Sequence, residues 1–149
     1  MPTPGPDDVI VRMEAAPINP SDMWPLFGPA DMASATLETN GSEAKLSAPI
    51  PTAFLDAVRA RLDQTLPVGN EGAGVVVATG DSPAAKALHG KVVAVMPGGS
   101  FSSYVKVPAI TCLAHNEGTT PLEAASSFVN PLTVLCFLET MRLENHTAI

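Results

Sequence analysis

The chain has 149 residues, of which 46% are hydrophobic and 15% are charged, and its formal net charge is −7 at pH 7. This length and composition predict one folded domain with a hydrophobic core, and they exclude a disordered chain. The eight Lys and Arg residues are scattered and form no basic stripe. We therefore expect no nucleic-acid partner.

The first part of the chain alternates between a strand signal and turn signals. Residues 8–18, DVIVRMEAAPI, predict a strand that runs into a turn. Residues 19–32 contain three prolines and a glycine, which predict a loop or broken turns. Residues 33–51 are small and polar without a clear period, so we expect an irregular insertion there, within a larger insertion at about 31–66.

The middle of the chain predicts short elements of both kinds. Residues 52–64 predict a helix with Thr52 as its cap, and residues 81–90 predict a short helical turn. Residues 91–108, KVVAVMPGGSFSSYVKVP, predict two strands around a Pro-Gly-Gly turn.

The last third of the chain is predicted to be helical. Thr120 and Glu123 have the spacing of a capping box. We expect a break near Asn130, because the residue before a proline disfavours the helical region, and then a second helix over residues 131–143 with Asn130 as its cap. That helix is apolar on all sides, so we expect a partner domain or subunit to cover it. The chain ends on NHTAI without a closing element, which suggests a piece of a longer protein.

Several features of the sequence indicate the cellular compartment of the protein. The start, MPTPGPDD, is acidic and rich in proline, unlike a signal peptide, and no apolar run looks long enough to cross a membrane. Cys112 and Cys136 lie far apart, and we interpret both as buried free thiols. We therefore expect a cytoplasmic protein with no membrane partner.

The stretch LPVGNEGAGVVVATGD, residues 66–81, raises the question of a phosphate-binding loop. Its glycines, Gly69, Gly72 and Gly74, have the spacing G-x-x-G-x-G, and a β-branched strand follows them rather than a helix. A dinucleotide fingerprint needs the spacing G-x-G-x-x-G and a helix. We therefore predict that these glycines let the backbone bend closely at the start of a strand. From the residues alone, Glu71 in this stretch reads as an ordinary surface acid.

Four stretches resemble the medium-chain dehydrogenase/reductase superfamily, in its quinone oxidoreductase and enoyl reductase branches. They are APINPSDMW, PVGNEGAGVV, GKVVAVMPGGSFSSYVKVP and AASSFVNPLTVLCFLETM, which occur in the family's order and span roughly residues 7 to 147. The resemblance implies a mainly β fold with a few helices, a partial GroES-like β-barrel over residues 1–129. Residues 130–149 would form the linking helix and the start of an absent α/β Rossmann half.

The resemblance also implies a reaction that needs no metal. Zinc members of this superfamily carry Cys and His ligands where this chain has Asn19 and Asn70. Amides are poor zinc ligands, so we expect no zinc and disfavour a zinc-dependent alcohol dehydrogenase. The implied activity is an NAD(P)H-dependent oxidoreductase that reduces an activated C=C or a quinone, and the 149 residues alone are expected to be inactive.

The resemblance assigns the site residues one by one. Asn19 and Asp22 are implied as catalytic, while Asn130 and Thr133 would contact NADPH or NADH, which the absent half would mainly bind. The substrate pocket would contain Trp24, Phe27, Asn70 and Glu71. From the residues alone, Asn19 and Asn130 are equally interpreted as simple caps of a turn and a helix.

Two questions stay open in the sequence. Enoyl thioester reductases that share INPSD carry a proton-donating tyrosine where this chain has Ala30, and Tyr104 reads as a half-buried strand residue, so the proton donor is not identified. The alternative function is a non-catalytic GroES-like interaction module, whose apolar helix binds another subunit. We expect the protein to self-associate as a homo-oligomer. If it is a reductase, we also expect a small-molecule substrate.

Overall fold

The computed structural model of this protein describes residues 1–148; Ile149, the last residue of the predicted 130–149 segment, lies outside them. The chain divides into two compact units, one formed by Met1–Ile18 with Pro67–Ile149 and the other by Asn19–Leu66.

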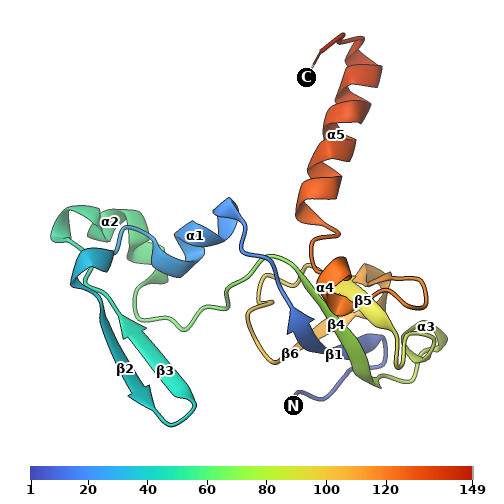
Figure 1. Ribbon diagram of the computed structural model, residues 1–149, viewed down its shortest axis with the longest axis horizontal. Coiled ribbons are helices and arrows are strands. Elements are labelled where there is room, and N and C mark those ends of the chain that lie inside the picture. The colour runs from blue at the N-terminus through green and yellow to red at the C-terminus, as the bar shows by residue number, and fades with distance from the viewer. Residues whose placement is uncertain (149) are drawn as a thin grey trace. The chain divides into compact units, whose positions relative to one another are not determined.

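The first unit is built on an open antiparallel sheet with the strand order β6-β1-β4-β5-β7 (Figure 1). The strands are β1 (Asp8–Ala15), β4 (Gly72–Thr79), β5 (Val92–Val95), β6 (Tyr104–Pro108) and β7 (Leu113–Ala114). The sheet has two edges, β6 and β7, so residues 1–148 contain no closed barrel. The structure combines sheets with a few helices, so the expected mainly β content is not borne out, and an open sheet is consistent with the predicted partial barrel.

Alternating valines place the larger of two buried clusters on one face of this sheet. In β6 the burial alternates between buried and exposed residues, so that Val105 and Val107 point into the core. They pack with the buried valines of the other strands, which are Val9, Val11, Val76, Val93 and Val95. Period-two alternation in β6 is what an edge strand with one covered face requires. In the middle of the sheet the alternate residues are buried too, because Ala73 and Ala94 pack with Ala124 and Ala125 in a second, smaller cluster.

The two strands predicted around the Pro-Gly-Gly turn exist, but they do not pair with each other. β5 pairs with β4 and β7, whereas β6 pairs with β1 at the opposite edge of the sheet. The prediction of a hairpin over residues 91–108 is therefore wrong. The strand signal was local, and the partner of each strand was set by side-chain burial against distant residues.

The second unit begins with a helix where the sequence predicted broken turns. Helix α1 covers Pro20–Phe27 and contains Pro25 in its interior. Pro20 occupies the first helical position, where a missing N–H costs nothing, and Asp22 accepts the N–H of Asn19. The N-terminal cap thus stabilises α1 by more than the loss of the Pro25 hydrogen bond destabilises it.

The predicted irregular segment 33–51 contains a hairpin, so this prediction is wrong for its centre. After a 3-10 turn, η1 (Met32–Ser34), strands β2 (Thr36–Asn40) and β3 (Glu43–Ser47) pair antiparallel (Figure 1). Every residue of both strands is exposed. Because the hairpin has no buried face, its residues show no alternating hydrophobic pattern, and a strand cannot be predicted from them.

The predicted helix over residues 52–64 is broken into three short turns. These are η2 (Thr52–Phe54), α2 (Leu55–Val58) and η3 (Arg59–Arg61). Thr52 is the first residue of the first turn rather than a cap, and Pro51 precedes it. Of these residues only Val58 is buried, so packing does not hold a longer regular helix together.

Two short helices of the first unit follow their predicted capping signals. Helix α3 (Pro83–Lys86) starts after Ser82, whose side chain accepts the N–H of Ala85, and η4 (Ala109–Thr111) follows β6. Helix α4 (Pro121–Ala124) starts after Thr120, and Thr120 and Glu123 form the predicted capping box.

Helix α5 (Val129–Glu144) begins one residue before the predicted cap, so Asn130 lies in its first turn and does not cap it. Pro131 is tolerated there because the first N–H groups of a helix have no intrahelical partner. The apolar side chains of α5 are largely exposed: Leu132, Val134, Leu135, Phe137 and Leu138 are between 43% and 55% accessible. Cys136 is exposed as well, so its prediction as a buried thiol is wrong.

Within the segment Pro121–Glu144, a window of 18 residues has a mean hydropathy of 1.3, and the segment is long and apolar enough to cross a membrane by length and composition. The expectation that no apolar run reaches this length is therefore not supported. The segment is interrupted by turns between α4 and α5, and the 16 residues of α5 alone are fewer than the ~20 that usually span a bilayer.

Candidate functional site

The structure places the predicted site residues in two groups, one in each unit. The second unit contains Asn19, Asp22, Trp24 and Phe27, all in or next to helix α1. The first unit contains Asn70, Glu71, Asn130 and Thr133, at the start of β4 and in the first turns of α5.

The start of α1 holds its two polar residues in a fixed arrangement. The backbone N–H of Asn19 donates to Asp22 Oδ2 at 2.7 Å, and the N–H of Asp22 donates to the carbonyl oxygen of Asn19 at 2.9 Å. Asp22 is fully buried and Asn19 is 7% exposed. Both residues are therefore positioned as an N-terminal cap, which agrees with the interpretation of Asn19 as a cap and makes Asp22 its positioning partner.

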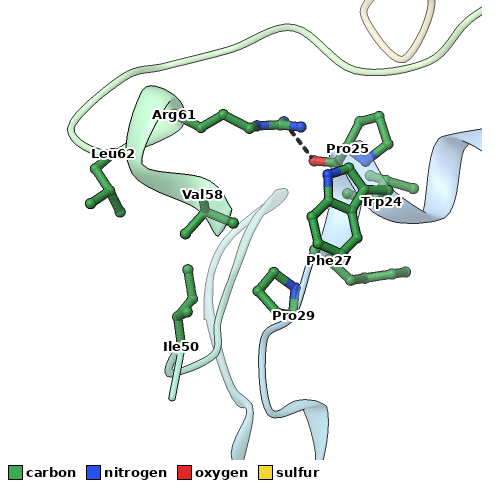
Figure 2. Close-up of a pocket in the computed structure, with 10 residues that line it drawn as sticks. Trp24, Pro25, Phe27, Pro29, Ile50, Val58, Arg61 and Leu62 are labelled. Atoms are coloured by element: carbon green, nitrogen blue, oxygen red, sulfur yellow. Dashed lines mark hydrogen bonds between the residues drawn. The ribbon is translucent and has the colours of Figure 1, made fainter. Parts of the chain in front are cut away.

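The end of α1 and the α2–η3 turns enclose a cavity of about 170 Å³. Most of the side chains that line it are apolar, among them Trp24, Phe27 and Val58, as Figure 2 shows. Arg61 reaches the same opening and donates from its guanidinium to the carbonyl oxygen of Pro25 at 3.1 Å. A cavity of this size holds about one aromatic ring.

Glu71 is fully buried, so its interpretation as an ordinary surface acid is wrong. Its Oε2 accepts the backbone N–H groups of Phe128 at 2.8 Å and Val129 at 2.9 Å. These amides open helix α5, where unsatisfied N–H groups and the helix dipole favour a negative charge. Glu71 therefore caps a helix that lies 57 residues further along the chain.

The glycines around Glu71 allow close contacts between backbone segments. A Cβ on Gly74 would lie 1.9 Å from the carbonyl oxygen of Arg12, and one on Gly72 would lie 2.8 Å from that of Ala15. Gly69 adopts a φ of +94°, in the left-handed region. The prediction that these glycines serve the strand and its turn is confirmed. The helix N-terminus nearest to Glu71 is occupied by a carboxylate, so this stretch provides no phosphate cradle.

The remaining predicted residues lie at accessible positions. Asn70 is half-buried beside Glu71, and Asn130 and Thr133 are exposed on α5. The hydroxyl of Thr133 donates to the carbonyl oxygen of Val129 at 2.8 Å. Their assignment to substrate and cofactor stays a prediction.

Two further features bear on the chemistry. Within residues 1–148, no three His, Cys, Asp or Glu side chains gather closely enough to hold a metal ion. Tyr104 is 40% exposed on edge strand β6, as its interpretation as a half-buried strand residue predicts.

Sequence reasoning missed two features of these sites. Arg61 belongs to the cavity, and its only sequence signal was a cation at the end of a predicted amphipathic helix. The amides of Phe128 and Val129 bind Glu71, and no local pattern reports a contact between residues so far apart.

Comparison with known proteins gives a consistent set of structural neighbours. No family model matches the chain, and no curated protein matches it. Among solved structures, a protein from Mesorhizobium loti assigned as an NADPH:quinone reductase is 29% identical with a TM-score of 0.65, and the match covers 96% of this chain and 35% of that one. A protein from Bacillus thuringiensis with the same assignment is 25% identical, with a TM-score of 0.62 and coverage of 95% and 34%.

A third neighbour extends the fold to another activity. The CurK enoyl reductase is 19% identical with a TM-score of 0.60, and the match covers 89% of this chain and 34% of that one, a likeness of fold. The chain thus spans about a third of the length of the solved proteins that it matches.

Proposed function

The solved neighbours of this chain are quinone oxidoreductases and enoyl reductases of the medium-chain dehydrogenase/reductase superfamily, the branch that its sequence resembles, and from this premise we propose that it is the substrate domain of a zinc-independent, NADPH-dependent reductase. Its substrate is an activated C=C compound or a quinone. The observation that carries the proposal is the match of 96% of the chain to one quinone reductase at 29% identity.

The cofactor would supply the hydride, and the described residues offer it only a small surface. The glycines of the turn lie against neighbouring backbone and side chains, and the first amides of α5 are bound by Glu71. Asn130 and Thr133 remain as exposed polar groups on the first turns of α5. This distribution fits a protein in which another part binds most of the cofactor.

The chain's own residues orient the substrate and stabilise the charge that develops on it. Hydride addition to a polarised C=C places negative charge on an oxygen atom, which hydrogen-bond donors stabilise without a metal. Asn19 is the donor that we assign to this role, and the buried carboxylate of Asp22 fixes its backbone at 2.7 Å. Amides at Asn19 and Asn70, in place of metal ligands, support a zinc-independent reaction. The cytoplasm is the compartment that we propose.

One observation favours the second candidate, a non-catalytic interaction module. The apolar side chains of α5 are about half exposed over most of the helix, as on a surface that another domain or subunit covers. Another subunit of a homo-oligomer, or a following domain, would each cover these apolar side chains. Their exposure alone therefore does not oppose a reductase.

The proposal is tested by cofactor binding and turnover in the longer protein that it requires. We expect NADPH fluorescence to change on binding, and NADPH to be oxidised with a quinone or an enone whether or not a zinc chelator is present. Absence of any NADPH binding would favour the interaction module, and loss of activity with chelator would contradict the zinc-independent reaction.

Asn19→Ala should lower turnover in that protein at least tenfold while removing about 1 kcal/mol or less of folding stability, the usual effect of losing a helix N-cap side chain. The backbone N–H that bonds to Asp22 is retained in the variant. Steady-state kinetics and urea unfolding measure the two effects separately. Unchanged kinetics would reduce Asn19 to its capping role.

A further inference from the structure

The cavity of the Asn19–Leu66 unit is lined mostly by apolar side chains and by a single charged residue. It is lined by Trp24, Pro25, Leu26, Phe27, Gly28, Pro29, Ile50, Val58, Arg61 and Leu62. Among these residues only Arg61 carries a charge. A pocket with a few placed polar groups in an otherwise apolar lining is the usual form of a small-molecule site.

Arg61 is held in place without an acidic partner. One of its terminal nitrogens donates to the carbonyl oxygen of Pro25, and in the described part of the chain it forms no ion pair with a carboxylate. Its neighbour Arg59, by contrast, is paired with Asp56 on the exposed surface. A guanidinium presents five N–H donors in a fixed fork, so the remaining donors of Arg61 are suited to a carboxylate.

We propose that this cavity binds a small planar carboxylate, with its ring between Trp24, Phe27 and Val58 and its acid group on Arg61. Figure 2 shows how Arg61 extends to the carbonyl oxygen of Pro25, with the indole of Trp24 beside this contact. The volume of about 170 Å³ accommodates one ring. Trp24 is half exposed, so its indole is available to stack on a ligand.

This inference extends the proposed function, because Trp24 and Phe27 are the residues assigned there to the substrate. It states that the substrate, or a regulator that uses the same cavity, carries an acid group. Binding can be measured without NADPH and without turnover, so either proposal can fail while the other holds.

The test uses Trp24, the only tryptophan of the 149-residue chain, as a reporter of the cavity. Benzoate, titrated into the full chain, should change the tryptophan fluorescence in a saturable way. Benzamide has the same shape without the charge and should bind at least tenfold more weakly. Acetate carries the charge without a ring and should leave the emission unchanged. Equal binding of benzoate and benzamide, or no response to benzoate, would overturn the proposal.

Two variants of Arg61 and one control variant, at Arg59, test whether the guanidinium binds the acid group. Arg61→Gln should weaken benzoate binding at least tenfold and leave benzamide binding unchanged, whereas Arg59→Gln, two residues away and outside the cavity, should alter neither. Arg61→Lys keeps the charge and should retain part of the affinity, which serves as the test if Arg61→Gln does not fold. Benzoate affinity that is unchanged in the Arg61 variants would show that the acid group is not bound there.

Discussion

Glu71→Ala should be among the most destabilising single substitutions in this chain, with a loss of roughly 3 kcal/mol or more in the free energy of unfolding. Glu71 is fully buried, and its Oε2 accepts two backbone amides, from Phe128 and Val129, at 2.8 and 2.9 Å. Removing the carboxylate leaves these N–H groups without their acceptor and the first turn of α5 without its negative charge. Urea unfolding of the variant and the wild type measures the difference.

Two further substitutions show whether the charge or the contact matters. Glu71→Gln keeps an acceptor oxygen without the charge, so it should lose about half as much stability, because neutral hydrogen bonds contribute less than charged ones. Glu117→Gln is the matched control, since Glu117 is exposed and should tolerate the change. If Glu71→Ala unfolded like the wild type but lowered turnover, Glu71 would belong to the substrate pocket and not to the helix cap.

The strands and the short capped helices could be predicted because their signals are local. The alternation of β6, the proline after Ser82 and the Thr120–Glu123 capping box each lie within a few residues. A local pattern, however, does not determine with which strand a given strand pairs. The sequence paired the segment around 92–95 with that around 104–108, yet each joins a different neighbour in the sheet.

The incorrect predictions for α5, α1 and the β2–β3 hairpin have three different physical causes. Helix α5 starts before Pro131 because Glu71, far away in the chain, caps its first amides. Helix α1 forms despite Pro25 because Asp22 fixes its first turn. The hairpin β2–β3 has no buried face and therefore no hydrophobic alternation to detect.

The candidate site could be predicted only through its resemblance to a family. From single residues, Glu71 read as a surface acid, because burial is a property of the fold and not of the residue type. Trp24 and Phe27 were assigned to a substrate pocket, and both line a cavity, but Arg61 could not be added to them. Its bond to Pro25 joins residues 36 positions apart.

The second large loss of stability is expected from substitution of Gly74. This substitution tests whether the glycines of residues 66–81 allow close backbone contacts or bind phosphate. β1 and β4 approach so closely here that a Cβ on Gly74 would lie 1.9 Å from the carbonyl oxygen of Arg12 and 2.7 Å from its carbonyl carbon. Both atoms belong to the backbone of a central strand, so a side chain cannot move aside to make room. Gly74→Ala should therefore remove about 3 kcal/mol or more of stability by overpacking.

Gly118→Ala separates this clash from the ordinary cost of replacing a glycine. Gly118 has a φ of +90° and nothing within 4 Å of an added Cβ, so its substitution should cost only about 1 kcal/mol of backbone strain. Gly74 is not among the glycines with positive φ, and its cost should come from the contact alone. Thermal and urea unfolding of both variants compare the two effects. A phosphate-binding role predicts the opposite pattern for Gly74→Ala, with unchanged stability and weaker NADPH binding in the longer protein, because a cradle loop meets its ligand and not a neighbouring strand.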